Sequence, residues 1–408
     1  MSRNKILNDP VYGFVNIPYG ILFDLMEHPY FQRLRRIKQV SLTHYVYPGA
    51  LHTRFHHALG ALHLMLQTID VLKGKGVEIS DEEATAVSIA ILLHDIGHGP
   101  FSHTLEHTLI NVHHEELSIL FMERLNQLFD NQLTLAIKIF KDEYPKKFLH
   151  QLVSGQLDMD RMDYLNRDSF FTGVHEGVIG YDRIIKMLAV HDGELVVEEK
   201  GIYSIEKFLI ARRLMYWQVY LHKTVLSAEL MLVQALKRAK LLAQKGVELE
   251  MPSNLRFFLD NNLTREDFTT QPETLLDHFA ALDDHDIVSA LKAWQVCSDA
   301  ILSFLAQSLI QRRLFKLEFH NEPMPNSHVE AIRKKLMDHP PYTHEWLPYL
   351  LISGMETNSA YSASKDEIKI LFKDGRVLPM SMVVDHGIQP RIFTKYYLCY
   401  PKIASSEH

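Results

Sequence analysis

Apolar residues recur at intervals of three and four positions over more than half of this 408-residue chain, from Tyr19 to Leu242. The pattern is clearest in IPYGILFDLMEHPYFQRLRRI, TRFHHALGALHLMLQTIDVL and EEATAVSIAILLHD. Such spacing places apolar side chains along one face of a helix, where they can pack against other helices. The sequence therefore predicts a mainly α-helical fold, with breaks at the Gly- and Pro-rich turns near Pro48, Gly74 and Gly99.

One short stretch inside the helical region has a different pattern. In GELVVEEKGIYS (193–204), β-branched residues flank a turn, which predicts a small β-hairpin. A long helix is expected to begin after it, near Ile205. Helical spacing then resumes from about Pro272 to Arg313.

The end of the chain is expected to form a smaller unit. The segments RRLFKLEF, YLLISG, EIKILFKDGRVLPMSMVV and RIFTKYYLCYP have the composition of strands, and the third contains an Asp-Gly turn at 374–375. We therefore expect a helical domain over residues 1–315 and an α+β unit over residues 316–408.

Composition disfavours several classes of protein. Because 43 basic and 50 acidic side chains give a formal net charge of −7, broad binding to nucleic acid or to an anionic membrane is not expected. The two cysteines, Cys297 and Cys399, form no CxxC pair, which disfavours a disulfide scaffold and cysteine-ligated zinc. MSRNKILNDP contains no apolar signal segment, and no apolar run approaches the roughly 18 residues of a membrane span. We therefore expect a cytoplasmic protein.

Histidine is concentrated in one part of the chain, since eleven of the 24 histidines fall between residues 44 and 114. There, in SIAILLHDIGHGPFSH, an apolar helix ends at His94 and Asp95 before a Gly-rich turn. Adjacent nitrogen and oxygen donors suit a divalent transition metal. The alternative is that both side chains satisfy helix-end groups. The same dipeptide at 191–192 and 285–286 lies in polar stretches and is interpreted as surface.

Two other segments have residues that could complete such a site. His56 and His57 lie in RFHHALG, inside an apolar helix where an unpartnered buried imidazole would be destabilising. Spacing alone does not choose between them, and a hydrogen-bonded core histidine is the alternative. In QLDMDRMDYLNRD, Asp160, Tyr164 and Asp168 share one helical stripe, which suggests a ligand beside a substrate contact. An acidic solvated face is the alternative there.

The ordered set RFHH, HDIGHGPFSH, HHEE and LDMDRMDY resembles the HD-domain phosphohydrolases, and within them the deoxynucleoside triphosphate (dNTP) triphosphohydrolases. The likeness begins at NDPVYG (8–13) and continues at least to VYLHK (219–223). It implies an HD-type helical core that hydrolyses dNTPs to deoxynucleoside and triphosphate. It further implies one divalent transition metal (Mn, Fe, Zn, Co or Ni), with Mg²⁺ accompanying the nucleotide, and a homo-oligomer, either dimer or tetramer. No SAM domain is expected.

The resemblance also implies roles for individual residues. The implied metal ligands are His57, His94, Asp95 and Asp160. His57 is preferred to His56 because the family's histidine follows an acidic residue in a RFEH-like string. The implied catalytic residues are His98, His103, Glu106 and His114, with His103 as a general acid oriented by Glu106. The implied substrate-binding residues are Gln39, Arg54, Arg161, Tyr164, Asp168, Arg212 and Tyr220. An allosteric nucleotide site would include Glu27, Gln32 and Arg35.

Some positions depart from the family's pattern. Leu221 stands where the vertebrate enzyme has a glutamine near the base, so the resemblance does not transfer a base preference. At the allosteric site Gln32 and Arg35 match the family, but Glu27 replaces an aspartate and Phe14 a histidine, so the resemblance leaves activation by a guanine nucleotide open. Two other functions fit the same metal site: hydrolysis of another phosphoester, such as a monophosphate or alarmone, and a nucleotide-sensing or nucleic-acid-binding scaffold without turnover. The presence of His103 and His114 beside the ligands favours an enzyme.

Overall fold

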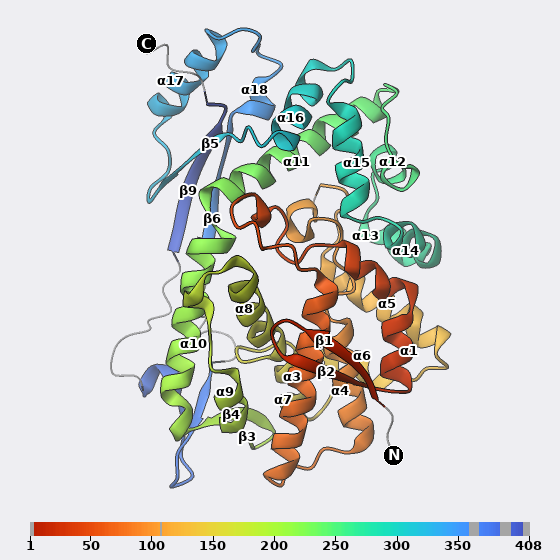
Figure 1. Cartoon of the computed structure of the whole chain (residues 1–408), viewed down its shortest axis with the longest axis vertical. Helices are drawn as coiled ribbons and strands as arrows, with labels where there is room; N and C mark the ends of the chain where they lie inside the picture. Colours follow the sequence, from red (N-terminus) through yellow and green to blue (C-terminus); the bar gives the residue numbers. More distant parts are fainter. Residues whose placement is uncertain (1–3, 107, 359–366, 384–392, 403–408) are drawn as a thin grey trace.

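The computed structural model describes residues 4–106, 108–358, 367–383 and 393–402. Helices account for most of it, which confirms the predicted fold class (Figure 1). The first half contains α1 Ile21–Glu27, α2 Pro29–Gln32, α3 Arg54–Gly74, α4 Asp81–Leu93, α5 His114–Leu128, α6 Thr134–Phe140, α7 Lys147–Val153, α8 Met159–Thr172 and α9 Tyr181–Met187. The second contains α10 Ile202–Met215, α11 Lys223–Gln244, α12 Ser253–Asp260, α13 Arg265–Thr270, α14 Pro272–Ala280, α15 Asp284–Trp294, α16 Ala300–Ile310, α17 Asn326–Met337 and α18 Leu347–Leu350.

The strands form three small sheets. They are β1 Asn4–Asp9, β2 Gly13–Pro18, β3 Leu188–His191, β4 Glu194–Glu198, β5 Lys316–His320, β6 Ile352–Asn358, β7 Lys369–Leu371, β8 Val377–Pro379 and β9 Phe393–Tyr400. β1 pairs with β2, β9 lies between β5 and β6, and the third sheet has the order β3-β4-β7-β8. Within the described residues no helix is both long and apolar enough to cross a membrane.

Three helices build the core around the histidine-rich region. α3 packs against both α4 and α8, and most of its 21 residues have buried side chains. α4 begins with a capping box in which Ser80 and Glu83 bind each other's backbone N–H groups. α8 begins at Asp158, whose side chain accepts from the Arg161 N–H, and ends at Gly173 with a φ of 75°. These caps fix where each helix starts and ends, and hence where its side chains lie.

The predicted hairpin exists, but it lies earlier in the chain than expected. β3 and β4 are joined by Asp192 and Gly193, whose φ angles of 50° and 77° suit a two-residue hairpin turn. Helix α10 begins at Ile202, so the second half of the predicted segment is helical. The sequence also failed to predict β1 and β2 and the helices α12 and α13.

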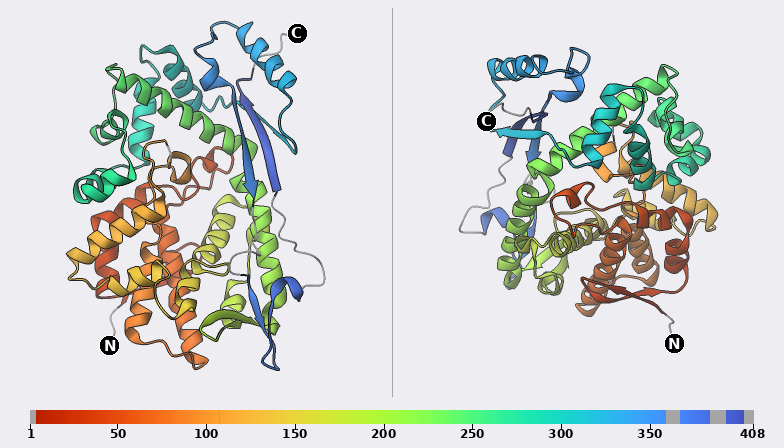
Figure 2. Two further views of the ribbon diagram at one scale, coloured as in Figure 1. Left: turned by 180° about the vertical axis from the view of Figure 1, so that it is seen from behind. Right: turned by 45° about the horizontal axis from the view of Figure 1, so that its top comes forward.

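The C-terminal strands are confirmed where the structure describes them. β5 packs against α11, and both views in Figure 2 place the sheet of β5, β9 and β6 beside that helix. Gly375, with a φ of 84°, lies in the predicted turn between β7 and β8. β7 pairs in parallel with β4, so the end of the chain shares a sheet with the hairpin. The domain boundary at residues 315 and 316 stays a prediction.

Candidate metal centre

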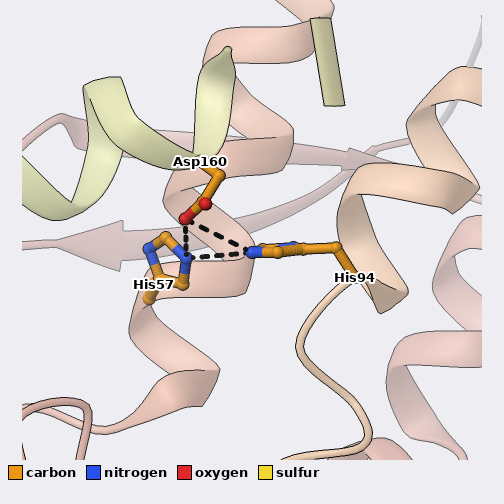
Figure 3. Close-up of side chains that lie close together, drawn as sticks. All are labelled: His57, His94 and Asp160. Carbon is orange, nitrogen blue, oxygen red and sulfur yellow. Dashed lines mark hydrogen bonds and ion pairs between the residues drawn. The ribbon is translucent and has the colours of Figure 1, made fainter. Parts of the chain in front are cut away.

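Two histidines and one aspartate from three helices converge at one point (Figure 3). His57 comes from the first turn of α3, His94 caps the C-terminus of α4 and Asp160 lies in the first turn of α8. The His57 Nε2 atom lies 3.2 Å from His94 Nε2 and 3.1 Å from Asp160 Oδ1, and the remaining pair is 3.5 Å apart. Two nitrogens and one carboxylate oxygen at these separations can share one divalent cation.

The far ring nitrogen of each histidine has its own partner. His57 Nδ1 lies 2.7 Å from Asp163 Oδ2, and His94 Nδ1 lies 2.6 Å from the carbonyl oxygen of Ile91. Because both partners are acceptors, each Nδ1 carries a proton, and each Nε2 faces the shared point, where it can bind a metal ion once any proton of its own has left. This arrangement of donors fits a bound metal ion.

The partner of His57 is itself held by a chain of charges. Asp163 accepts bonds from Arg167 at 2.9 and 3.0 Å, and Arg167 donates to Asp9 on β1 at 2.7 Å. The close approach of α3 and α8 depends on Gly60, where an added Cβ would lie 2.0 Å from Asp163 Oδ1. The first strand of the chain therefore supports the orientation of His57.

The electrostatics of the cluster favour positive charge. Burial alone would lower the pKa of His57, but its bonds to Asp160 and Asp163 outweigh burial and raise the pKa to about 10. Burial would raise the pKa of Asp160, but the two histidines hold that pKa well below its usual range. The cluster is therefore suited to holding a cation.

Asp95, the fourth predicted ligand, faces the same cluster. Its carboxylate lies 3.4 Å from His94 Nε2 and 3.7 Å from His57 Nε2. It also forms a salt bridge with Arg54 and lies 3.3 Å from His98 Nε2. Burial and Arg54 hold the pKa of His98 well below its usual range, so that imidazole is neutral at pH 7.

The Gly-rich turn after Asp95 is tightly packed. Ser118 on α5 donates to the His94 carbonyl at 2.8 Å and accepts from the Gly97 N–H at 2.9 Å. A Cβ on Gly97 would lie 2.2 Å from the carbonyl oxygen of His114. Arg33, fully buried, donates to the carbonyl oxygens of Ile96 and His98. The turn is thus fixed from two sides.

A cavity of about 590 Å³ adjoins the cluster and is lined by both Asp95 and Asp160. Seven of the eleven residues predicted to bind substrate or to act in catalysis also line it: Gln39, Arg54, His98, His114, Tyr164, Asp168 and Tyr220. A space of this size is ordinary for a nucleotide-sized ligand. The fold therefore brings together residues that lie as much as 181 positions apart in the sequence.

Two of these residues are joined by a hydrogen bond. The Tyr220 hydroxyl donates to Asp168 at 2.7 Å, and His52 Nε2 lies 2.6 Å from the other carboxylate oxygen. Tyr220 ends a π-helical segment, Tyr216–Tyr220, of a kind often found at functional sites. Burial raises the pKa of both Tyr164 and Tyr220, so both phenols stay protonated and can donate.

Other predicted residues lie away from the cavity surface. Among the described residues, Arg161 pairs with Asp158 and the Gly155 carbonyl, and Arg212 donates to Gln156 at 3.3 Å. Neither arginine lines the cavity.

The residues of the predicted allosteric site also lie outside the cavity. Arg35 donates to Gln32 at 2.8 Å and stacks on Phe55, and Glu27 is exposed.

The two His-Asp pairs that were predicted to lie on the surface, at 191–192 and 285–286, differ from each other. Asp192 is exposed, whereas Asp286 is half-buried and caps α15.

Glu106 lies next to His114. Its carboxylate accepts from the His114 backbone N–H at 2.9 Å and lies 3.0 Å from His114 Nδ1. The ring of His114 stacks on His98 at 3.9 Å. The side chain of His103 lies outside the described residues, so its predicted role stays a prediction.

Some site residues had no predicted role. Asp163 lies in QLDMDRMDYLNRD, where no feature of the sequence distinguishes it from the neighbouring aspartates. Glu229 and Glu356 also line the cavity, from α11 and β6. The one signal in the sequence for Glu229 is a charged residue on the otherwise apolar stripe of Leu226, Leu230 and Val233.

Comparison with known families and relatives agrees with this geometry. Residues 54–168 match the family described as HD domain, and residues 179–251 match the one described as HD associated region. An uncharacterized protein, YwfO of Bacillus subtilis, is 32% identical over 425 residues, covering 98% of this chain and 93% of that protein. A protein named deoxynucleoside triphosphate triphosphohydrolase SAMHD1 homolog, from Dictyostelium discoideum, is 31% identical over 292 residues, covering 67% of this chain and 56% of that protein.

A solved structure is similar over nearly the whole chain. The crystal structure of a phosphohydrolase from Bacteroides thetaiotaomicron has a TM-score of 0.94 and 52% sequence identity, covering 98% of this chain and all of that one. A hypothetical protein from Aquifex aeolicus has a TM-score of 0.74 at 26% identity, covering 98% of this chain and 97% of that one.

Proposed function

Because this chain belongs to the HD-domain phosphohydrolase superfamily, we propose that it hydrolyses dNTPs to a deoxynucleoside and intact triphosphate. The observation that carries the proposal is one cavity bordered by the His57, His94 and Asp160 cluster and also by the bonded pair Asp168 and Tyr220. A phosphate group at the cluster and a deoxyribose at the pair would suit both sets of residues.

The metal would be held by His57, His94 and Asp160, with Asp95 as the fourth ligand. HD domains bind divalent metals, and such an ion, when bound, lowers the pKa of a water and polarises a phosphoryl oxygen. We propose a transition metal (Mn, Fe, Zn, Co or Ni), with Mg²⁺ carried by the nucleotide.

The surrounding residues would position and neutralise the triphosphate. Arg54 lines the cavity and carries a fixed positive charge beside Asp95. His114, held by Glu106, and neutral His98 can donate hydrogen bonds to phosphoryl oxygens. His103 would protonate the leaving 5′ oxygen of the sugar, so that the released group is a neutral alcohol.

Product analysis tests the proposal. The enzyme is incubated with each dNTP and Mn²⁺, and the products are separated by ion-exchange chromatography and identified by mass. We expect triphosphate and deoxynucleoside in equal amounts. Release of orthophosphate or pyrophosphate would instead support another phosphoester as substrate, and no turnover with any metal would support a binding scaffold.

A matched pair of variants tests whether the metal cluster carries the activity. His94→Ala combined with Asp95→Ala should abolish hydrolysis and metal binding. The same two changes at His191 and Asp192, a His-Asp pair in the hairpin turn, should leave both at the wild-type level. Equal losses in the two double variants would mean that the cluster is not the catalytic centre.

Discrimination against ribonucleotides is proposed to depend on Tyr164. Its ring lines the cavity and lies edge-on to Tyr220, with centroids 6.1 Å apart, next to the proposed position of the sugar. Tyr164→Ala should therefore narrow the ratio of kcat/KM for dATP over ATP. If that ratio is unchanged, the residue does not exclude the 2′-hydroxyl.

We also propose a homo-oligomer, a dimer or tetramer, with a nucleotide activator bound near Gln32 and Arg35. Light scattering measures the assembly with and without nucleotides. Turnover of single and mixed dNTPs tests the activator, because activity that appears only in mixtures requires a second site. Full activity with every single dNTP would remove the need for one.

A further inference from the structure

One wall of the cavity is a single face of α11. Leu226, Glu229, Leu230 and Val233 all line the cavity, and their spacing of three and four residues places them on the same side of the helix. Glu356 on β6 lines the same cavity. Two carboxyl groups thus face a space that α11 otherwise lines with apolar side chains.

The contacts of Glu229 leave part of its hydrogen-bonding capacity unused. The hydroxyl groups of Ser41 and Thr104, whose oxygens lie 2.9 Å apart, are close enough to its carboxyl group to lower its pKa. A carboxylate has about four acceptor positions, so two hydroxyl groups leave about half of them available to a ligand. Burial and the nearby Glu356 raise the pKa of Glu229 to about 7, even though both hydroxyls lower it.

The metal cluster and this wall belong to different parts of the fold. The cluster is built on α3, α4 and α8, whereas the two carboxyl groups come from α11 and β6 (Figure 1). A nucleotide with its phosphates at the cluster and its sugar at Asp168 and Tyr220 has its base left to contact the α11 wall.

We propose that Glu229 and Glu356 determine base specificity, selecting dNTPs whose base carries an amino group at the N6 or N4 position, as adenine and cytosine do, an inference that rests on the proposed function. Adenine (N6) and cytosine (N4) carry such an N–H donor at the edge where thymine (O4) and guanine (O6) carry a carbonyl oxygen. An amino group at this edge donates to the Glu229 carboxylate, which is ionised above its pKa of about 7. A carbonyl of thymine or guanine at the same place leaves acceptor facing acceptor, and a mismatch of buried polar groups discriminates strongly.

Steady-state kinetics with the four dNTPs test the inference. In the wild-type protein at a pH of about 8.5, where Glu229 is ionised, kcat/KM for dATP and dCTP should exceed that for dTTP and dGTP by about tenfold or more. Glu229→Gln keeps the size of the side chain and adds an N–H donor that suits thymine, so the preference should fall several-fold. Glu356→Gln, on a different element, should act in the same direction. Glu248→Gln, which removes one negative charge at an exposed position, should keep the wild-type ratios.

The outcomes separate this inference from the proposed function. Hydrolysis of all four dNTPs with the same base ranking in wild type and both cavity variants would overturn the inference alone. If no dNTP releases triphosphate, the proposed function fails, and dissociation constants of the four dNTPs are then measured in EDTA on the same proteins. A preference for the adenine and cytosine nucleotides that Glu229→Gln or Glu356→Gln removes would support the inference, and equal constants would overturn it. Thermal unfolding identifies a variant that does not fold, and the other variant then decides.

Discussion

Replacing Gly60 by alanine should weaken metal binding, although Gly60 is not in contact with any of the proposed metal ligands. The added Cβ would lie 2.0 Å from Asp163 Oδ1 and 2.2 Å from Arg167 Nη2. Ordinary contact begins at 3.4 Å, so α3 and α8 must separate by about 1.4 Å or the two side chains must move. Metal sites tolerate errors of only about 0.2 Å in ligand distance. We therefore expect metal affinity to fall by roughly 10- to 100-fold and stability by about 1–3 kcal/mol.

Competition with a chromophoric chelator measures the affinity, and denaturant unfolding measures the stability. Gly74→Ala is the matched control because Gly74 ends the same helix and an added Cβ there meets nothing within 4 Å. It should leave metal affinity unchanged. If Gly60→Ala bound metal as tightly as Gly74→Ala, the packing of α3 on α8 would not determine the geometry of the site.

Three further changes have expected outcomes. Asp163→Asn should lower metal affinity by roughly 10- to 100-fold, because the amide no longer fixes the proton on His57 Nδ1, and a chelator titration equal to wild type would contradict this. Removing the metal with EDTA should abolish hydrolysis and lower Tm. Compared with protein at a free metal concentration of 100 times Kd, the free energy of unfolding should fall by about 2.7 kcal/mol. Activity that survives chelation would contradict a metal-dependent reaction. Burial would raise the pKa of Glu318, but Lys316, Tyr400 and His328 outweigh it and lower the pKa to about 2. Glu318→Gln should therefore reduce the free energy of unfolding by about 1–3 kcal/mol at pH 7, by an amount that shrinks as the pH falls from about 4.5 to 2, and a difference constant over that range would refute the assignment.

The helical architecture was predictable because burial against other helices leaves a periodic pattern in the sequence. The hairpin was misplaced because Leu188 to His191 continue the apolar spacing of α9, and only the turn at Asp192 and Gly193 marks the change. β1 and β2 were missed although β2 buries alternate residues, Val15 and Ile17. Strands this short give weak signals beside a long helical pattern.

The predicted ligands come together because their motifs fix their positions on three helices, although their role as ligands stays a prediction. The partners of those ligands could not be predicted in the same way. Asp163 meets His57 because of how closely α3 crosses α8, and that separation depends on Gly60. Glu229 and Glu356 line the same cavity although more than a hundred residues separate them in the chain. Such contacts depend on tertiary packing, which local pattern does not encode.

The C-terminal part of the chain completes structures that begin earlier, since β7 pairs in parallel with β4 and β6 contributes to the cavity. This order has a consequence for synthesis of the chain. His57, His94 and Asp160, together with the bonds through Asp163 and Arg167 to Asp9, are complete once α8 has left the ribosome. The α11 wall follows later, and Glu356 later still. Synthesis proceeds from the N-terminus, and units of the chain made first can fold first. A nascent chain therefore contains all of its proposed metal ligands before it contains every residue that lines the cavity.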